Sequence, residues 1–234
     1  VVVAAVLVAC ALPGIRLPSG PALLSNNDRI HVDGDSKYVW MALVVIAVYF
    51  AGATSVWSFL ERIGNDAGIG QSSIGLALSI AKVAGVAGAL TAHYVGDRYG
   101  SRAPHIFALG LMLLSMFVLW SATSPFHYAF GAGAFEYAWT IAAVFQIAHV
   151  ARMDRTKGLI VLTPAALTLG GVIGPALAGQ IITTQGFAGL FAMVSLTTIA
   201  ATVGIVYLNI RASVDNLGYD NSVTNVGHLS DPPK

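Results

Sequence analysis

The chain has 234 residues, of which 56% are hydrophobic and only 10% are charged, and its mean hydropathy is +0.74. An ordinary soluble domain carries about 25% charged residues, so this chain has too few charges to cover its apolar core in water. The net charge of +1 indicates no nucleic-acid partner, and the single cysteine, Cys10, excludes an internal disulfide framework and a cysteine-based metal cluster. We therefore expect an integral membrane protein without a metal or cofactor.

The N-terminal region consists of an apolar stretch and a polar linker. Residues 1–13 are apolar, but a helix needs about 20 residues to cross a membrane. No charged region precedes them, as it would in a signal peptide. We interpret them as the end of a truncated transmembrane helix, so the chain is predicted to be a fragment. Residues 14–37 combine Gly, Pro and Ser with charged residues and are predicted to form a linker.

Six long apolar segments follow the linker. Each is long enough to cross a bilayer of about 30 Å as an α-helix. Strands of an outer-membrane barrel would span about 9 to 11 residues and alternate in polarity, and these segments do neither. The expected fold is an all-α bundle of six membrane helices over residues 38–210, followed by a disordered polar tail over 211–234. The predicted spans are 38–59, 71–95, 105–123, 126–150, 159–183 and 187–210.

The basic residues predict the orientation of these spans. Ten of the 12 Lys and Arg residues lie on one side of the membrane, in the linker, two loops and the tail. Arg62 lies on the opposite side, and Lys82 lies inside the second span. Loops rich in Lys and Arg stay in the cytoplasm, so the linker and the tail are predicted to be cytoplasmic. The bacterial plasma (inner) membrane is the expected location.

The loop between the second and third spans resembles the signature loop of the major facilitator superfamily. The family pattern is G-x-x-x-D-R-x-G-R-[KR], and this chain reads "HYVGDRYGSR". His93 stands in place of the first glycine, and Ser101 replaces one basic residue. The fifth span, "LTLGGVIGPALAGQI", resembles the glycine–proline helix motif of the same family. The matching residues are Asp97, Arg98, Gly100 and Arg102 in the loop, and Gly170, Gly174, Pro175 and Gly179 in the span.

This resemblance implies half of a twelve-helix transporter. With a partial helix before the linker, the six spans fit helices seven to twelve, the C-terminal half, and the missing N-terminal half is an expected partner. The family also implies inverted three-helix repeats within each half, with a binding site near the middle of the membrane. Residues 85–92, "GVAGALTA", and 171–178, "GVIGPALA", share a pattern consistent with such a repeat. In the family, the seventh, eighth, tenth and eleventh helices line the cavity.

Two ionisable residues lie deep inside the predicted spans, Lys82 in the second and Glu136 in the fourth. A charge at the centre of a membrane helix costs roughly 2.5 to 3.5 kcal/mol on insertion scales, so such residues usually face a cavity or a partner. Both lie near the midpoints of their spans. We expect them to lie near each other across the cavity, where the carboxylate exchanges a proton or the lysine holds an anionic substrate group. The alternative is a static ion pair that only fixes helix packing.

Other polar and aromatic residues extend the candidate pathway. On a helical wheel, Trp139 and Thr140 share a face with Glu136, and Gln146 lies at its edge. For the aromatic candidates, ordinary packing or an interfacial position is the alternative. These aromatic candidates are Tyr49, Trp57, Tyr137 and Trp139.

The signature loop and the fifth span have a mechanical interpretation. Asp97 can accept hydrogen bonds from a neighbouring helix N-terminus, and Arg98 and Arg102 can pair with carboxylates or lipid headgroups. Such contacts would hold a cytoplasmic gate closed. Pro175 removes a backbone donor and is expected to kink the fifth span.

The predicted function is that of a secondary transporter which moves a small solute by alternating access, coupled to protons. An intramembrane enzyme is the main alternative, but the chain has no His-Glu-x-x-His, no Gly-x-Ser-x-Gly and no paired aspartates within spans. A transporter-like sensor that binds a solute without moving it is the third possibility.

Overall fold

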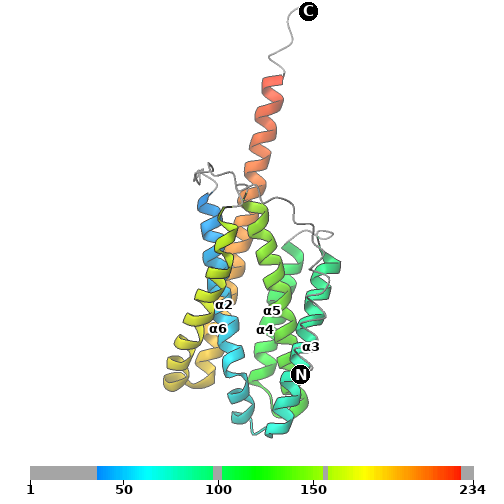
Figure 1. Ribbon diagram of the computed structural model, residues 1–234, viewed down its shortest axis with the longest axis vertical. Coiled ribbons are helices and arrows are strands. Elements are labelled where there is room, and N and C mark those ends of the chain that lie inside the picture. The colour runs from blue at the N-terminus through cyan, green and yellow to red at the C-terminus, as the bar shows by residue number, and fades with distance from the viewer. Residues whose placement is uncertain (1–35, 97–101, 155–157, 228–234) are drawn as a thin grey trace, which may run out of the picture. The chain divides into compact units, whose positions relative to one another are not determined.

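The computed structural model describes residues 36–96, 102–154 and 158–227, and these residues are almost entirely helical, with no strand among them (Figure 1). The predicted truncated helix (residues 1–13) and most of the linker lie outside the described residues, as do Asp97, Arg98 and Gly100 of the signature loop. The all-α fold class is confirmed. The elements are α2 (Ser36–Asp66), α3 (Gln71–Val95), α4 (Arg102–Trp120), α5 (Pro125–Met153), the short 3-10 helix η2 (Ile160–Leu162) and α6 (Thr163–Gly227).

Local signals in the sequence account for the helix boundaries. Gly68 between α2 and α3 has φ +73°, a conformation that glycine adopts without strain. Ser124 is the N-cap of α5, where its hydroxyl accepts a hydrogen bond from the backbone N–H of His127 at 3.3 Å, and a proline follows at the first helical position. Asp154 ends α5, and its carboxylate accepts backbone hydrogen bonds from Leu159 at 2.8 Å and from Ile160 at 2.7 Å.

The structure has five α-helices in the described residues where six were predicted. The fifth and sixth predicted spans belong to one element, α6, whose backbone leaves helical angles at Gly186 (φ 67°, ψ −164°). Gly186 divides α6 into a first arm, residues 163–185, and a second arm, residues 187–227. In Figure 1 the yellow first arm and the orange second arm run in opposite directions. The break falls between the fifth and sixth predicted spans, so the chain reverses direction where the sequence predicted a connection.

Contacts along α2 confirm that the two arms are antiparallel. A Cβ added to Gly170 would meet the backbone of Ala47, and one added to Gly174 would meet that of Ala51, so the first arm runs parallel to α2. On the second arm the order is reversed. There Gly204 faces Val45, while Thr197 lies against Gly52, seven residues further along α2. Both arms therefore pack against α2 at the same depth.

Four described segments are long and apolar enough to cross a membrane: Lys37–Asp66, Gln71–Val95, Ala103–Trp120 and Ile160–Arg211. The last covers both arms of α6. Helix α5 is not among the four, and it contacts α2, α3 and α4. A helix surrounded by protein need not be apolar on every side, which explains why α5 is the helix that carries Glu136 and Gln146.

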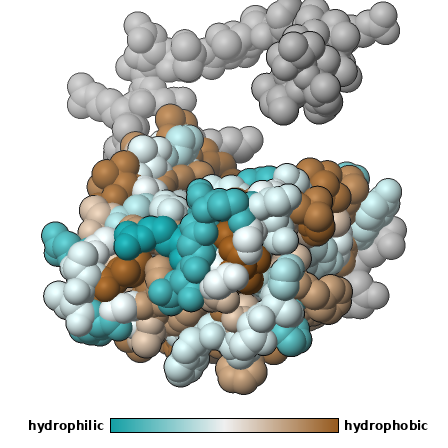
Figure 2. Space-filling model, turned by 90° about the horizontal axis from the view of Figure 1, so that it is seen from below, coloured by the Kyte–Doolittle hydropathy of each residue, from teal (hydrophilic) through white to brown (hydrophobic). Residues whose placement is uncertain are grey.

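Polar side chains are found at the ends of the helices. Figure 2 views the bundle from the end where α2 passes into α3, and there hydrophilic and weakly polar residues surround smaller apolar areas. At this end the side chain of Gln71 donates a hydrogen bond of 2.8 Å to that of Asn65. The exposed sides of the helices are instead rich in large apolar residues, for example Leu114 and Phe117 on α4. Polar ends and apolar sides are the distribution that a lipid bilayer requires.

Two boundary predictions need correction. Helix α2 begins at Ser36, inside the predicted linker, and α6 continues to Gly227, so the first part of the predicted disordered tail is helical. The helix can continue here because residues 211–227 contain no proline. Each residue added to an existing helix also forms one further backbone hydrogen bond. Pro175 lies inside the first arm and does not break it. The residue of α6 with non-helical backbone angles is Gly186.

The predicted inverted repeat is visible in the helix contacts. On α3, a Cβ added to Gly88 would lie 2.7 Å from the backbone oxygen of Tyr137 on α5. On α6, a Cβ added to Gly174 would collide with the backbone oxygen of Ala51 on α2. The spacing along the chain from Gly88 to Gly174 equals the spacing from Ala51 to Tyr137. The contact between α3 and α5 is therefore the repeat equivalent of the contact between the first arm of α6 and α2.

Candidate functional site

Two glycines bring α3 and α5 close together. A Cβ at Gly85 would lie 2.9 Å from Cγ of Glu136, and Gly88, one turn later, lies against the backbone of Tyr137. Small residues at this spacing allow two membrane helices to approach backbone to backbone. The close approach places Lys82, one turn before Gly85, within reach of α5.

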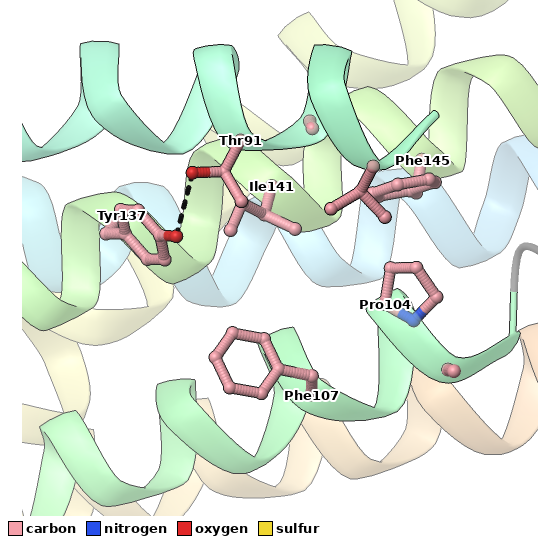
Figure 3. Close-up of a pocket in the computed structure, with 9 residues that line it drawn as sticks. Thr91, Pro104, Phe107, Tyr137, Ile141 and Phe145 are labelled. Atoms are coloured by element: carbon pink, nitrogen blue, oxygen red, sulfur yellow. Dashed lines mark hydrogen bonds between the residues drawn. The ribbon is translucent and has the colours of Figure 1, made fainter. Parts of the chain in front are cut away.

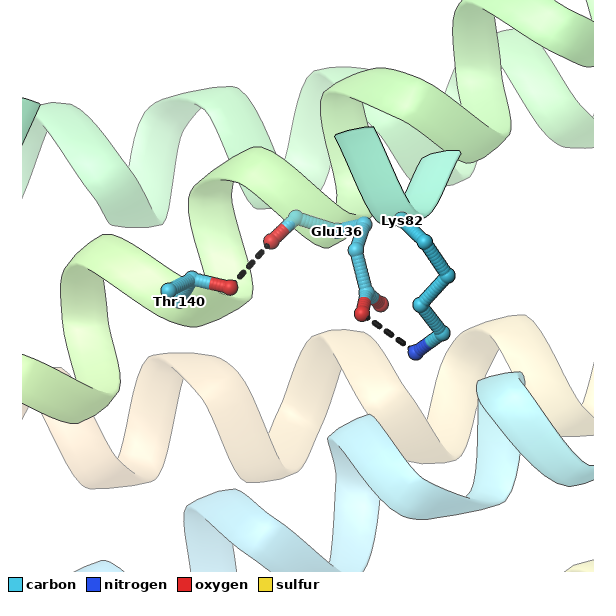
Figure 4. Close-up of polar contacts among 3 residues, drawn as sticks. All are labelled: Lys82, Glu136 and Thr140. Atoms are coloured by element: carbon cyan, nitrogen blue, oxygen red, sulfur yellow. Dashed lines mark hydrogen bonds and ion pairs between the residues drawn. The ribbon is translucent and has the colours of Figure 1, made fainter. Parts of the chain in front are cut away.

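Lys82 and Glu136 form an ion pair across this contact. Nζ of Lys82 donates a hydrogen bond of 2.5 Å to Oε1 of Glu136 (Figure 4). Figure 4 also shows the hydroxyl of Thr140, which donates a 2.9 Å hydrogen bond to the backbone oxygen of Glu136 and not to its carboxylate. The two ionisable residues predicted to meet are therefore in contact.

Two tryptophans surround the ammonium group of Lys82. Nζ lies 3.3 Å from the ring centroid of Trp57 on α2 and 6.0 Å from that of Trp139 on α5. A cation over an indole face is attracted by the negative charge of the π system, by about 0.5 to 2 kcal/mol depending on its exposure to water. The site is thus built from three helices, α2, α3 and α5.

The two partners of the ion pair differ in exposure. The side chain of Lys82 is 53% exposed, whereas that of Glu136 is 8% exposed. Oε2 of Glu136 is buried and has no hydrogen-bond partner among the described residues. A buried carboxylate oxygen without a donor is costly, so Glu136 depends on Lys82 for most of its stabilisation. The charge presented to the outside of this bundle is therefore the ammonium group.

The side of α3 that carries Lys82 includes several small or polar exposed residues, together with the exposed Val86 one turn later. Gly75 and Ser79 precede Lys82 on this side, and Ala89 and His93 follow it. A Cβ added at Gly75 would meet nothing within 4 Å. This exposed side leaves space for a ligand or for another protein segment next to the ammonium group.

The other predicted pathway residues lie elsewhere. Tyr49 is buried and its hydroxyl has no hydrogen-bond partner among the described residues. Gln146 is 1% exposed, and both polar atoms of its amide lack a protein partner in the described part of the chain. Trp139 packs against Phe50 with ring centroids 5.9 Å apart and against Phe135 at 5.7 Å. Of these three, the structure brings only Trp139 to the ion pair.

Sequence reasoning underestimated two parts of the site. Trp57 was one aromatic candidate among several, and nothing in its local pattern distinguished it, because its contact with Lys82 depends on how α2 and α3 pack. Gly85 and Gly88 were recognised as part of a repeat but not as the contact that positions Lys82. Their spacing, Gly-x-x-Gly one turn after a lysine in the middle of an apolar span, was the available signal.

An apolar cavity of about 340 Å³ lies between α3, α4 and α5, separate from the ion pair (Figure 3). Across it, the hydroxyl of Tyr137 donates a 2.9 Å hydrogen bond to that of Thr91. Phe107, Ile141 and Phe145 form much of the remaining lining. Neither Lys82 nor Glu136 lines this cavity, so it is not the predicted substrate site.

The predicted cytoplasmic gate lies mostly outside the described residues. Among its residues the structure places only Arg102, whose backbone begins α4. The role of the signature loop therefore stays a prediction. The glycine–proline motif is described in full, and Gly170 and Gly174 form the tight contact with α2, while Gly179 lies near the ring of Phe59.

Comparison with known families agrees with this arrangement. The family model of the Major Facilitator Superfamily matches residues 42–225, which covers most of the chain and includes α3, α5 and the ion pair. No curated protein matches the chain.

Proposed function

The chain belongs to the major facilitator superfamily of membrane transporters, and we propose that it forms part of a secondary active transporter that moves a small solute by alternating access. Its family and its apolar helices make it an integral membrane protein. The observation that carries the proposal is the ion pair between Lys82 and Glu136 near the midpoints of α3 and α5. Ionisable residues at this depth mark substrate or proton pathways.

The chemistry of this pair supports coupling to protons. When Glu136 takes up a proton, its charge is neutralised and its attraction for Lys82 falls to that of a neutral hydrogen bond. Lys82 is half exposed and is then free to leave Glu136 and pair with another group. The two protonation states thus differ in their contacts between α3 and α5, as a coupled conformational change requires. In this mechanism Glu136 is the proton site and Lys82 responds to it.

A purely structural role for the pair is the main competing explanation. The repeat-equivalent contact between Gly174 and Ala51 makes the same close approach without an ion pair. At the position equivalent to Lys82 stands Thr168, and at that of Glu136 stands Phe50. Because this contact forms without charges, holding two helices together is not a sufficient reason to bury a glutamate. This favours a role in transport.

The orientation proposed from the basic residues places the linker and the C-terminal tail in the cytoplasm of a bacterial cell. Helix α2 would then leave the cytoplasm at its N-terminus, and α3 would return to it. The second half of the cavity would come from a preceding six-helix half of the same transporter. A solute sensor of similar architecture would bind its ligand without flux, and an enzyme would need catalytic groups in addition to this pair.

Chemical labelling tests alternating access without knowledge of the substrate. Ser79→Cys is placed on the exposed side of α3, one turn from Lys82, in a cysteine-free background in which Cys10 is serine. A membrane-impermeant thiol reagent is applied to vesicles from one side and then from the other. We expect labelling from both sides, because a carrier exposes its cavity to each side in turn.

The matched control is Leu114→Cys on the exposed apolar side of α4, which should stay unlabelled because lipid covers it. Because protonation of Glu136 changes the contacts between α3 and α5 in this mechanism, the rate of Ser79→Cys labelling should depend on pH more strongly than the reactivity of a free thiol does. Glu136→Gln should remove this additional dependence while leaving the labelling itself. Absence of labelling from either side would refute an aqueous pathway at Lys82. Unchanged pH dependence in Glu136→Gln would refute the assignment of Glu136 as the proton site.

A further inference from the structure

The charge that this bundle offers to a ligand is positive. Of the charged side chains that the structure describes, only Lys82 and Glu136 lie in the middle of their helices, and only Lys82 is exposed. An ammonium group has three N–H donors, and Glu136 is the only hydrogen-bond acceptor for them among the described residues. Donors of Lys82 therefore remain available on its exposed side.

We propose that the substrate is a small organic monoanion with a flat apolar body, taken up together with one proton. This inference rests on the proposed function and adds the substrate class to it. The anionic group pairs with Lys82, and the proton resides on Glu136.

Charge balance selects a monoanion. The pair of Lys82 and Glu136 is neutral, so an anion alone would give the site a net charge of −1 in a poorly solvated environment. One proton on Glu136 restores neutrality and also releases Lys82 from its 2.5 Å contact with the carboxylate. A cation would instead lie beside Lys82 and repel it, and a dianion would require a second proton site, whereas Glu136 is the only carboxylate in the middle of a helix among the described residues.

The flat apolar body follows from the aromatic rings around the ammonium group. The face of Trp57 lies 3.3 Å from Nζ of Lys82, and Trp139 borders the same group at 6.0 Å. Both indoles are partly exposed. When Lys82 turns from Glu136 to a substrate anion, these rings lie next to the body of that substrate. Planar apolar groups pack best on such faces, by offset stacking or edge contact.

The test uses four probes that share a small size and differ in charge or shape. Benzenesulfonate is a permanent monoanion, benzenesulfonamide is neutral, benzyltrimethylammonium is a permanent cation, and methanesulfonate is an anion without a ring. Permanent ions are suitable because they cannot carry a proton across the bilayer by themselves. The carrier is reconstituted in liposomes that contain a pH-sensitive dye, and each probe is added outside.

We expect benzenesulfonate to acidify the liposome interior. Methanesulfonate should do so at a rate at least ten times lower, and the neutral and cationic probes should cause no acidification. Lys82→Met should lower the benzenesulfonate rate at least tenfold, whereas Lys82→Arg should retain most of it because the positive charge remains. Arg62→Met is the charge-matched control, since it removes a cation at the end of α2, and it should behave as the unchanged protein. Size-exclusion elution of each variant establishes that it is folded.

Three outcomes would overturn the inference: flux of benzyltrimethylammonium without flux of benzenesulfonate, no acidification with either sulfonate, or an unchanged benzenesulfonate rate in folded Lys82→Met. In each case the labelling of Ser79→Cys decides separately whether the carrier function stands. Labelling from both sides with any of these outcomes would refute the monoanion and leave the transporter intact.

Discussion

The contact between α3 and α5 and the contact between α2 and the first arm of α6 are two versions of the same structure. In both, a glycine on one helix meets a backbone oxygen on the other, Gly88 with Tyr137 and Gly174 with Ala51. Only the first contact carries charges. In the second contact, Thr168 stands at the position of Lys82 and Phe50 at that of Glu136. The hydroxyl of Thr168 donates a hydrogen bond to the backbone oxygen of Pro164, and the ring of Phe50 packs on Trp139.

This difference separates the scaffold from the chemistry. The close approach of glycine to backbone occurs twice, so it is a property of the repeated framework. The ion pair occurs once, at a place where the framework already holds two helices together. Changes to the glycines should therefore affect folding, and changes to the charged residues should affect function more than folding.

The largest expected effect is on folding, from Gly174→Leu. A side chain at Gly174 would collide with the backbone of Ala51, which cannot move without displacing α2. We expect a loss of about 3 kcal/mol or more in stability and little folded protein, measured as the monodisperse size-exclusion peak after detergent extraction. Gly88→Leu should be nearly as damaging. Gly110→Leu is the control, because a Cβ there meets nothing within 4 Å, and equal yields for Gly174→Leu and Gly110→Leu would show that the two contacts are not essential.

The second prediction compares the equivalent positions Lys82 and Thr168. Lys82→Met leaves Glu136 buried without its partner, and we expect a cost of about 1 to 3 kcal/mol, less than for a fully buried pair because Lys82 is half exposed. Thr168→Met should change stability by less than about 0.5 kcal/mol, as is usual for an exposed position. Thermal unfolding in detergent measures both. The double variant Lys82→Met with Glu136→Gln should recover part of the loss, and strictly additive effects would contradict a direct coupling of the two charges.

The third prediction concerns Gly85 and its repeat equivalent Gly171. An added methyl group at Gly85 would lie 2.9 Å from Cγ of Glu136, whereas at Gly171 it would lie 3.8 Å from Cγ2 of Thr54, an ordinary contact. Gly85→Ala should therefore displace the carboxylate, cost about 1 kcal/mol and alter the pH dependence of Ser79→Cys labelling. Gly171→Ala should be neutral or stabilising by up to about 1 kcal/mol, since alanine favours a helix more than glycine does. The reverse order of thermal stabilities would contradict the described geometry.

The smallest expected effect is that of Tyr137→Phe. This change removes the 2.9 Å hydrogen bond to Thr91, which links α3 and α5 beyond the glycine contact. We expect a loss of about 0.5 to 1.5 kcal/mol in thermal unfolding, the usual net value of one hydrogen bond. Tyr94→Phe, at an exposed position on α3, is the matched control and should lie within about 0.5 kcal/mol of the unchanged protein. If both variants were equally stable, the hydrogen bond would contribute nothing to the contact.

Most of the fold could be predicted because its signals are local. Apolar segments of the right length, separated by short breaks, predicted where the helices lie. The separation of the fifth and sixth spans was also predicted at the right place, since the backbone leaves helical angles at Gly186 and the two arms run in opposite directions. The error occurred where local signals were weakest. The predicted tail contains no proline before Pro232, and the helix continues into it.

The sequence alone determined that the protein lies in a membrane, that its helices contain one lysine and one glutamate near their midpoints, and that small residues recur with the spacing of an inverted repeat. These properties depend on composition and on the period of a helix, both of which are local. Only the tertiary structure decided that Lys82 contacts Glu136, that Trp57 covers the ammonium group, and that the carboxylate is buried while the lysine is exposed. The physical reason is that Lys82 and Glu136 lie 54 positions apart on different helices. Their contact depends on how closely Gly85 and Gly88 allow α3 to approach α5, and no periodicity within one helix encodes that distance.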